Sequence, residues 1–127
     1  MKWKLDTERP IYLQIVEHIE KDIMKGKYPP HSQLPSVRAL ALEIGVNPNT
    51  VQRAMAELER KGLVVSQRTN GRFITDDQER IQQMKREFAQ AEIQMFLSHM
   101  HDLGLDTKAV IEAIQKVEGK KDDQNCM

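Results

Sequence analysis

The chain of 127 residues lacks several features that mark secreted, membrane-spanning or metal-binding proteins. Its only cysteine is Cys126, which excludes a disulfide framework and a thiolate metal cluster. No window approaches the roughly 18 apolar residues of a membrane span, and the first residues lack the apolar run of a signal peptide. We therefore expect a cytoplasmic protein with no membrane partner.

Aromatic residues are also scarce, and the net charge is zero. A protein-binding surface would typically expose aromatic side chains, which only six Phe, Tyr and Trp residues could supply. The zero charge hides an asymmetry, because residues 1–75 carry 12 Lys/Arg and 8 Asp/Glu, whereas residues 76–127 carry 7 and 11. The first part of the chain is thus the part suited to a polyanion.

No pattern of catalytic residues is present. The chain has no glycine-rich phosphate loop and no nucleophile motif, and its histidines are scattered. His99 and His101, two residues apart, would point to different sides of a helix and could share a metal only if the helix ended between them. We predict no enzyme activity, no cofactor and no metal site.

Hydrophobic periodicity and helix-capping residues predict three helices in the first half of the chain. The first covers residues 10–25 and ends before Gly26. A proline-rich loop, "KYPPHSQLPS", separates it from a short helix over residues 37–44, with Ser36 as N-cap. The third helix covers residues 48–61, because Asn47 is a preferred N-cap and Pro48 suits the first helical position.

The second and third helices are joined by only Gly-Val-Asn, a connection typical of a helix-turn-helix. Helical hairpins without DNA-binding function also have this pattern. The stretch "GLVVSQRTNGRFIT" (62–75) then predicts a β-hairpin with an Asn-Gly turn, flanked by Arg68 and Arg72. Such a hairpin could be merely solvated, but directly after a helix-turn-helix it predicts a winged helix.

From residue 76 the pattern becomes heptad-like and then broadly apolar. A turn at Leu103-Gly104-Leu105 precedes a last helix, which begins at residue 106 or 107 and ends near Val117. Two short helices cannot form a core alone, so they must pack on the winged helix, on another subunit or on both. We favour a homodimer formed through this segment. The predicted interface residues are Ile81, Met84, Phe88, Ala91, Met95, Phe96, Ile111 and Ile114.

The predicted fold is therefore mainly α with a small β-wing. Residues 1–75 form a winged helix-turn-helix domain, residues 76–118 a two-helix dimerisation segment, and residues 119–127 a polar, disordered tail. Trp3 is expected to pack as part of a short N-terminal strand or arm. The alternative is that it lines a crevice for an effector.

Four motifs in the first 75 residues occur in a characteristic order. "PIYLQI" opens the first helix, "LPSVRALA" the second and "NTVQRA" the third, and "LERKGLV" leads into the wing. With these motifs, residues 9–75 resemble the winged-helix domain of GntR-type transcriptional regulators. The two C-terminal helices, with "LGLD" between them, resemble the YtrA subfamily, whose small all-α dimerisation segment replaces a large ligand-binding domain.

The resemblance implies a dimeric transcription factor, usually a repressor, that binds a palindromic operator in double-stranded DNA. Genes for ABC transporters often lie beside members of this branch. No ligand-binding domain is visible, so any small-molecule effector would have to use the dimer interface or a crevice between the two segments. The family resemblance also implies a set of DNA-binding residues. They are Ser36, Arg38, Asn47, Asn49, Thr50, Gln52, Arg53, Arg68, Asn70 and Gly71.

Three positions depart from the family pattern. Pro48 stands where many members have arginine, so one guanine-reading side chain is absent, and Asn49 or Gln52 is expected to favour A·T pairs. Thr69 replaces the first glycine of the wing. His31 replaces a loop glycine, which histidine can do because it tolerates a positive φ better than most residues. A winged helix used as a protein-interaction module remains the alternative function.

Overall fold

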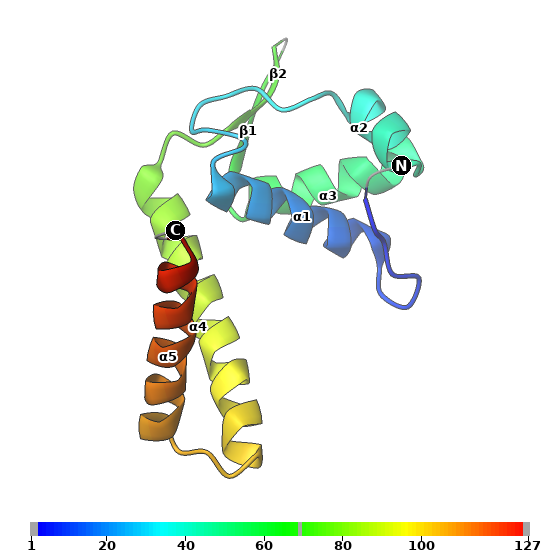
Figure 1. Cartoon of the computed structure of the whole chain (residues 1–127). Coiled ribbons are helices and arrows are strands. Elements are labelled where there is room, and N and C mark those ends of the chain that lie inside the picture. The colour runs from blue at the N-terminus through cyan, green and yellow to red at the C-terminus, as the bar shows by residue number, and fades with distance from the viewer. Residues whose placement is uncertain (1–2, 69, 126–127) are drawn as a thin grey trace. The chain divides into compact units, whose positions relative to one another are not determined.

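Five helices and one hairpin make up the described part of the chain, residues 3–68 and 70–125 of a computed structural model (Figure 1). The predicted fold class, mainly α with a small β-wing, is confirmed. The elements are α1 (Ile11–Lys25), α2 (Val37–Ile44), α3 (Pro48–Arg60), β1 (Val64–Gln67), β2 (Gly71–Ile74), α4 (Gln78–Asp102) and α5 (Thr107–Asn125). They belong to two compact units, residues 1–85 and 86–127.

The helix-turn-helix is capped as the sequence predicts. The Ser36 side chain accepts a hydrogen bond from the Ala39 amide at 3.0 Å, which satisfies a free donor at the start of α2. Asn47 Oδ1 accepts from the Asn49 amide at 2.8 Å at the start of α3. Between the two caps, Gly45 ends α2 in the left-handed conformation with φ +84°. These local contacts fix where the two helices begin.

The core of the first unit lies between α1, α2, α3 and the hairpin. One face of α3 is fully buried and consists of Val51, Ala54, Met55 and Leu58. It packs against the buried face of α1, so the opposite face of α3 is left in solvent. That face of α1 includes Ile15, Ile19 and Ile23. The arrangement is the usual one for an amphipathic helix on a small core.

The core also takes in the first turns of α4. Ile81 and Met84 are only 6% and 7% exposed and belong to the core cluster of the first unit. The compact unit consequently extends to residue 85, beyond the boundary at residue 75 that the sequence predicts. The heptad-like pattern of α4 thus reflects, at its start, packing within the chain.

The wing is a two-stranded antiparallel hairpin whose register runs from Val64 opposite Ile74 to Gln67 opposite Gly71. The Asn70 amide donates to the Gln67 carbonyl at 3.1 Å, and Gly71 follows with φ +91°. Gln33 donates from Nε2 to the Asn70 carbonyl at 2.7 Å, which ties the loop before α2 to the wing. In that loop His31 has φ +68°, consistent with its replacement of a loop glycine.

The residues before α1 are held against the first unit. Trp3 is 6% exposed, and its ring stacks on that of His18 with centroids 3.6 Å apart. The Gln14 side chain accepts from the Asp6 amide at 2.7 Å and donates to the carbonyls of Asp6 and Arg9. The segment before α1 is therefore an arm whose Trp3 side chain packs in the core.

The second unit consists of the latter part of α4 together with α5. Asp106 caps α5, since its Oδ1 accepts from the Ala109 amide at 2.8 Å. The helix continues to Asn125, past the predicted end near Val117, so residues 119–125 of the predicted disordered tail are helical. Residues 126 and 127 lie outside the described part of the chain. The stretch after Val117 contains no proline, and a single glycine, Gly119, costs too little to stop a helix.

Candidate nucleic-acid interface

The first two turns of α3 present the predicted recognition residues to solvent. Asn49, Gln52 and Arg53 are exposed, and Thr50 is half-buried. They lie outward because Val51, Ala54 and Met55 occupy the inward positions at helical spacing. Asn47 is also exposed, but its side-chain oxygen already caps the helix.

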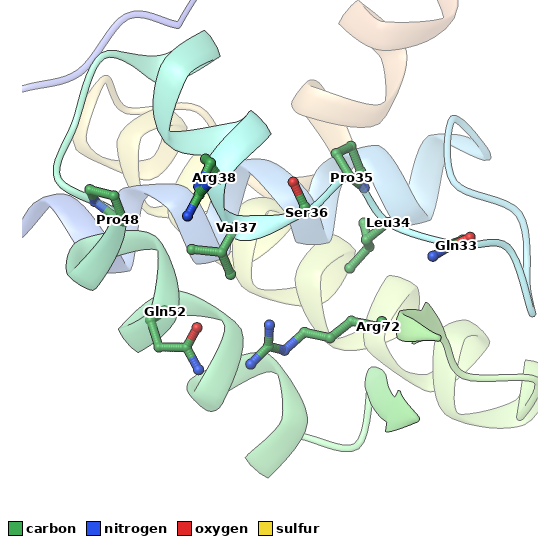
Figure 2. A pocket seen from close by; sticks show the side chains of 10 residues that line it. Gln33, Leu34, Pro35, Ser36, Val37, Arg38, Pro48, Gln52 and Arg72 are labelled. Atoms are coloured by element: carbon green, nitrogen blue, oxygen red, sulfur yellow. The ribbon is translucent and has the colours of Figure 1, made fainter. Parts of the chain in front are cut away.

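A hollow of about 460 Å³ lies beside these turns (Figure 2). It brings together the start of α2, the start of α3 and the first residues of β2 beside the wing turn, three segments that are separate in the sequence. Four of the predicted DNA-binding residues line it, namely Ser36, Arg38, Gln52 and Gly71. The remaining lining residues are Gln33, Leu34, Pro35, Val37, Pro48 and Arg72.

Arg38 is the cation that α2 contributes to this hollow. Its side chain is exposed, and within the described residues no carboxylate forms an ion pair with it. The neighbouring Ser36 hydroxyl accepts from the Ala39 amide. This corner of the hollow can therefore offer a full positive charge to an anionic ligand such as a phosphate.

A second hollow lies on the other side of α3, against the start of α1. It is lined by Pro10, Ile11, Tyr12, Asn49, Thr50 and Arg53. The Arg53 guanidinium lies over the Tyr12 ring, with its central carbon 3.9 Å from the ring centroid. This cation–π contact limits where Arg53 can point. The sequence gives no sign of this role for Tyr12, which is one residue of an apolar helix face.

The wing tip holds two of the predicted residues, Arg68 and Asn70, and both are exposed. Neither lines the hollow beside α3, although the next residue, Gly71, does. Gly71 has a positive φ, and a Cβ at this position would lie 3.0 Å from Gln33 Nε2. Glycine is therefore favoured here by the positive φ of the turn, whereas the flexible Gln33 side chain could move to admit a Cβ.

Arg72 flanks the wing turn along the chain, since it follows Gly71 and lies opposite Ser66, but its side chain is directed toward α3. Its Nε donates to Glu59 Oε1 of α3 at 2.8 Å. Its guanidinium extends from β2 into the hollow, where Figure 2 shows it directed toward Gln52. The sequence carries no signal for this placement, because it depends on the strand register and on the packing of α3 against the wing.

The predicted dimer residues fall into two groups. Ile81 and Met84 are covered within the chain, as described above. The other six are exposed on α4 and α5: Phe88, Ala91, Met95, Phe96, Ile111 and Ile114. In the second unit an apolar hollow of about 280 Å³ is lined by residues of both helices, among them Phe96, Val110 and Ile114.

No helix among residues 3–68 and 70–125 is long and apolar enough to cross a lipid bilayer. His101 Nε2, near the end of α4, lies 3.3 Å from the hydroxyl of Thr107, the first residue of α5. Both His99 and His101 are exposed.

Comparison with known proteins agrees with this geometry. The sequence profile described as "Bacterial regulatory proteins, gntR family" matches residues 11–74. The chain is 35% identical over 112 residues to the uncharacterised HTH-type transcriptional regulator YhcF of Bacillus subtilis, covering 88% of this chain and 93% of that protein. It is 32% identical over 123 residues to the HTH-type transcriptional repressor YtrA of the same organism, covering 92% and 95%.

A solved structure gives the same result for the fold. A GntR family transcriptional regulator from Listeria monocytogenes superposes with a TM-score of 0.82 at 38% identity, covering 88% of this chain and 98% of that one. These proteins are regulators and not enzymes, and the agreement with YtrA extends over both units. The chain belongs to the GntR family and is a DNA-binding transcriptional regulator, consistent with the YtrA subfamily.

Proposed function

We propose that the chain acts in the cytoplasm as a homodimeric repressor of its own operon and binds a palindromic operator. ABC transporter genes are candidate members of that operon. The observation that carries the proposal is the hollow that gathers Arg38, Gln52 and Gly71 from three separate segments. Similarity to a relative named as a transcriptional repressor supports the direction of regulation.

The proposed DNA contacts fall into two groups, which bind backbone phosphates and base edges respectively. Arg38 at the start of α2, Thr50 on α3 and Arg68 at the wing tip attract backbone phosphates, a contribution that weakens as salt rises. Asn49, Gln52 and Arg53 lie on the exposed face of α3, the face that enters the major groove and reads base edges. Asparagine and glutamine pair bidentately with adenine, so A·T pairs are favoured at the positions they meet.

Four other residues shape the interface more than they read it. Ser36 and Asn47 cap the two helices, which fixes the directions in which Arg38 and Asn49 leave the backbone. Asn70 and Gly71 form the end of the wing, where Gly71 has no side chain to keep a phosphate away from the backbone. The Ser36 and Asn47 side chains are already hydrogen-bonded, Gly71 has no side chain, and the Asn70 carbonyl accepts from Gln33, so positioning is the main contribution of these residues.

Dimerisation through the second unit completes the proposal. Large apolar side chains on this unit are well exposed, for example Phe96 at 43% and Ile114 at 47%. An exposed apolar surface of this kind marks an interaction site. Covered by a second copy, it would place two recognition helices on half-sites one or more helical turns apart, at about 34 Å per turn.

The assignment of phosphate contacts and base contacts to different residues is tested with two single variants, each measured on operator and random duplexes. Arg38→Ala removes a phosphate contact, so binding to both duplexes weakens alike and the salt slope falls by about one unit. Gln52→Ala removes a base contact and costs about 1–3 kcal/mol of discrimination at particular base pairs. Equal losses on both duplexes in both variants would refute this assignment of roles.

A further inference from the structure

Arg72 and Glu59 form an ion pair at the edge of the recognition surface. Arg72 is the second residue of β2 and lies opposite Ser66, and Glu59 is in the last turn of α3. Their side chains are 22% and 33% exposed, and Arg72 Nε donates to Glu59 Oε1 at 2.8 Å. Ion pairs at this level of exposure contribute little to folding stability, so the main consequence of the pair is the direction it gives to Arg72.

In this orientation, the terminal nitrogens of the Arg72 guanidinium remain available for further hydrogen bonds. A guanidinium has five N–H donors, and the bond to Glu59 uses the one on Nε. The two terminal nitrogens carry the other four, in a planar fork that matches a pair of acceptors. In Figure 2 this end of Arg72 extends across the hollow toward the Gln52 amide of α3.

The terminal nitrogens of Arg72 lie at the same hollow as residues of the recognition helix, α3. Arg72 and Gln52 line the same hollow, which Arg38 lines from the start of α2. A duplex seated against α3 meets Gln52, and its nearest acceptors then come within reach of the Arg72 fork. An arginine held at one nitrogen loses less side-chain freedom on binding than one that is unrestrained, which favours the contact.

We propose that Arg72 is a further DNA-contacting residue that offers its two terminal nitrogens to a pair of acceptors on the bound duplex, and that Glu59 positions it. The inference rests on the proposed function and adds to it a cation from β2 of the wing. Two features of DNA present such an acceptor pair. One is a backbone phosphate, and the other is the major-groove edge of guanine, with O6 and N7.

The first test is fluorescence anisotropy of the full chain with its operator and with a shuffled duplex. Arg72→Ala is expected to weaken operator binding about tenfold or more, the size of a lost bidentate contact. Arg60→Ala is the matched control, because Arg60 pairs with Glu57 on the same helix and lowers the pKa of that carboxyl, but does not line the hollow. It removes the same charge and should weaken binding less than threefold, as for a surface charge near DNA.

The second test separates positioning from charge. Removing the Glu59 carboxylate should strengthen binding to any polyanion if charge alone matters. If Glu59 holds Arg72 in place, Glu59→Ala instead weakens operator binding, and the weakening disappears when Arg72 is already alanine. Glu59→Gln keeps an acceptor oxygen for Arg72 Nε and should retain most of the affinity. Stronger binding by Glu59→Ala in both backgrounds would overturn the positioning role.

The same data identify the acceptor. Equal weakening on both duplexes, with a salt slope lower by about 0.9, indicates a phosphate. Weakening confined to the operator indicates a guanine edge. Arg72→Lys keeps the charge without the planar fork, so it should preserve the salt slope but not the affinity. Thermal melting of each variant checks that it folds.

The outcomes distinguish this inference from the function on which it rests. If the wild-type chain prefers the operator and Arg72→Ala binds as tightly as Arg60→Ala, the contact by Arg72 is overturned and the proposed function stands. If the wild-type chain binds the operator and the shuffled duplex alike, the proposed function fails, and the inference fails with it.

Discussion

Replacing Ile114 by glutamate should dissociate the dimer. Ile114 is 47% exposed on α5, beside the apolar hollow of the second unit. Full burial of an isoleucine contributes about 1.5–3 kcal/mol, so covering the exposed half contributes about 1 kcal/mol. A two-fold interface contains the residue twice, which makes about 2 kcal/mol per dimer. The substitution also places two carboxylates in an apolar surface, which adds a desolvation cost.

The dissociation constant of the dimer should therefore rise at least about 30-fold. Sedimentation equilibrium over a range of protein concentrations measures it, since one chain has a mass of 14.7 kDa. Leu42→Glu is the matched control, because Leu42 is 80% exposed on α2, in the other unit. A wild-type chain that stays monomeric at micromolar concentration, or an Ile114→Glu chain that dimerises as tightly as Leu42→Glu, would refute the proposed interface.

Two further substitutions test how the recognition helix is held. Asn47→Ala removes the cap of α3 and should lower the free energy of unfolding by about 1 kcal/mol, measured by urea denaturation. An unchanged urea midpoint would mean that the cap does not contribute to folding stability. Tyr12→Ala removes the ring beneath Arg53 and should weaken operator binding severalfold, as measured by fluorescence anisotropy. Tyr12→Phe should keep the cation–π contact and the affinity. Equal losses of affinity in both variants would assign the effect to the hydroxyl.

Much of the first unit could be predicted from the sequence because local chemistry specifies it. Ser36 and Asn47 mark the starts of α2 and α3 with side-chain oxygens that accept backbone hydrogen bonds. Gly45 marks the end of α2 because its positive φ is costly for other residues. Pro48 then falls at the first position of α3, where proline is favoured. Each of these signals acts within a few residues.

The features that could not be predicted depend on contacts between distant residues. An apolar stripe shows that a helix face is covered, but not what covers it. The stripe of α4 predicts that Ile81 and Met84 lie in a dimer interface, whereas they lie in the core of their own unit. The direction of Arg72 depends on Glu59, which belongs to another element. Arg53 is likewise held by Tyr12, across the contact between α3 and α1.

The end of α5 could not be predicted for a different reason. Beyond Val117 the sequence is polar, and polarity alone does not distinguish an exposed helix from an unstructured tail. The helix continues to Asn125.

The most direct test of the central claim measures binding to the promoter DNA of the chain's own operon. Fluorescence anisotropy compares this duplex with a shuffled one at two salt concentrations. A dimeric repressor should bind the promoter more tightly than the shuffled duplex, with two chains per site and an affinity that falls steeply as salt rises. Equal affinity for the two duplexes at both salt concentrations would contradict the claim.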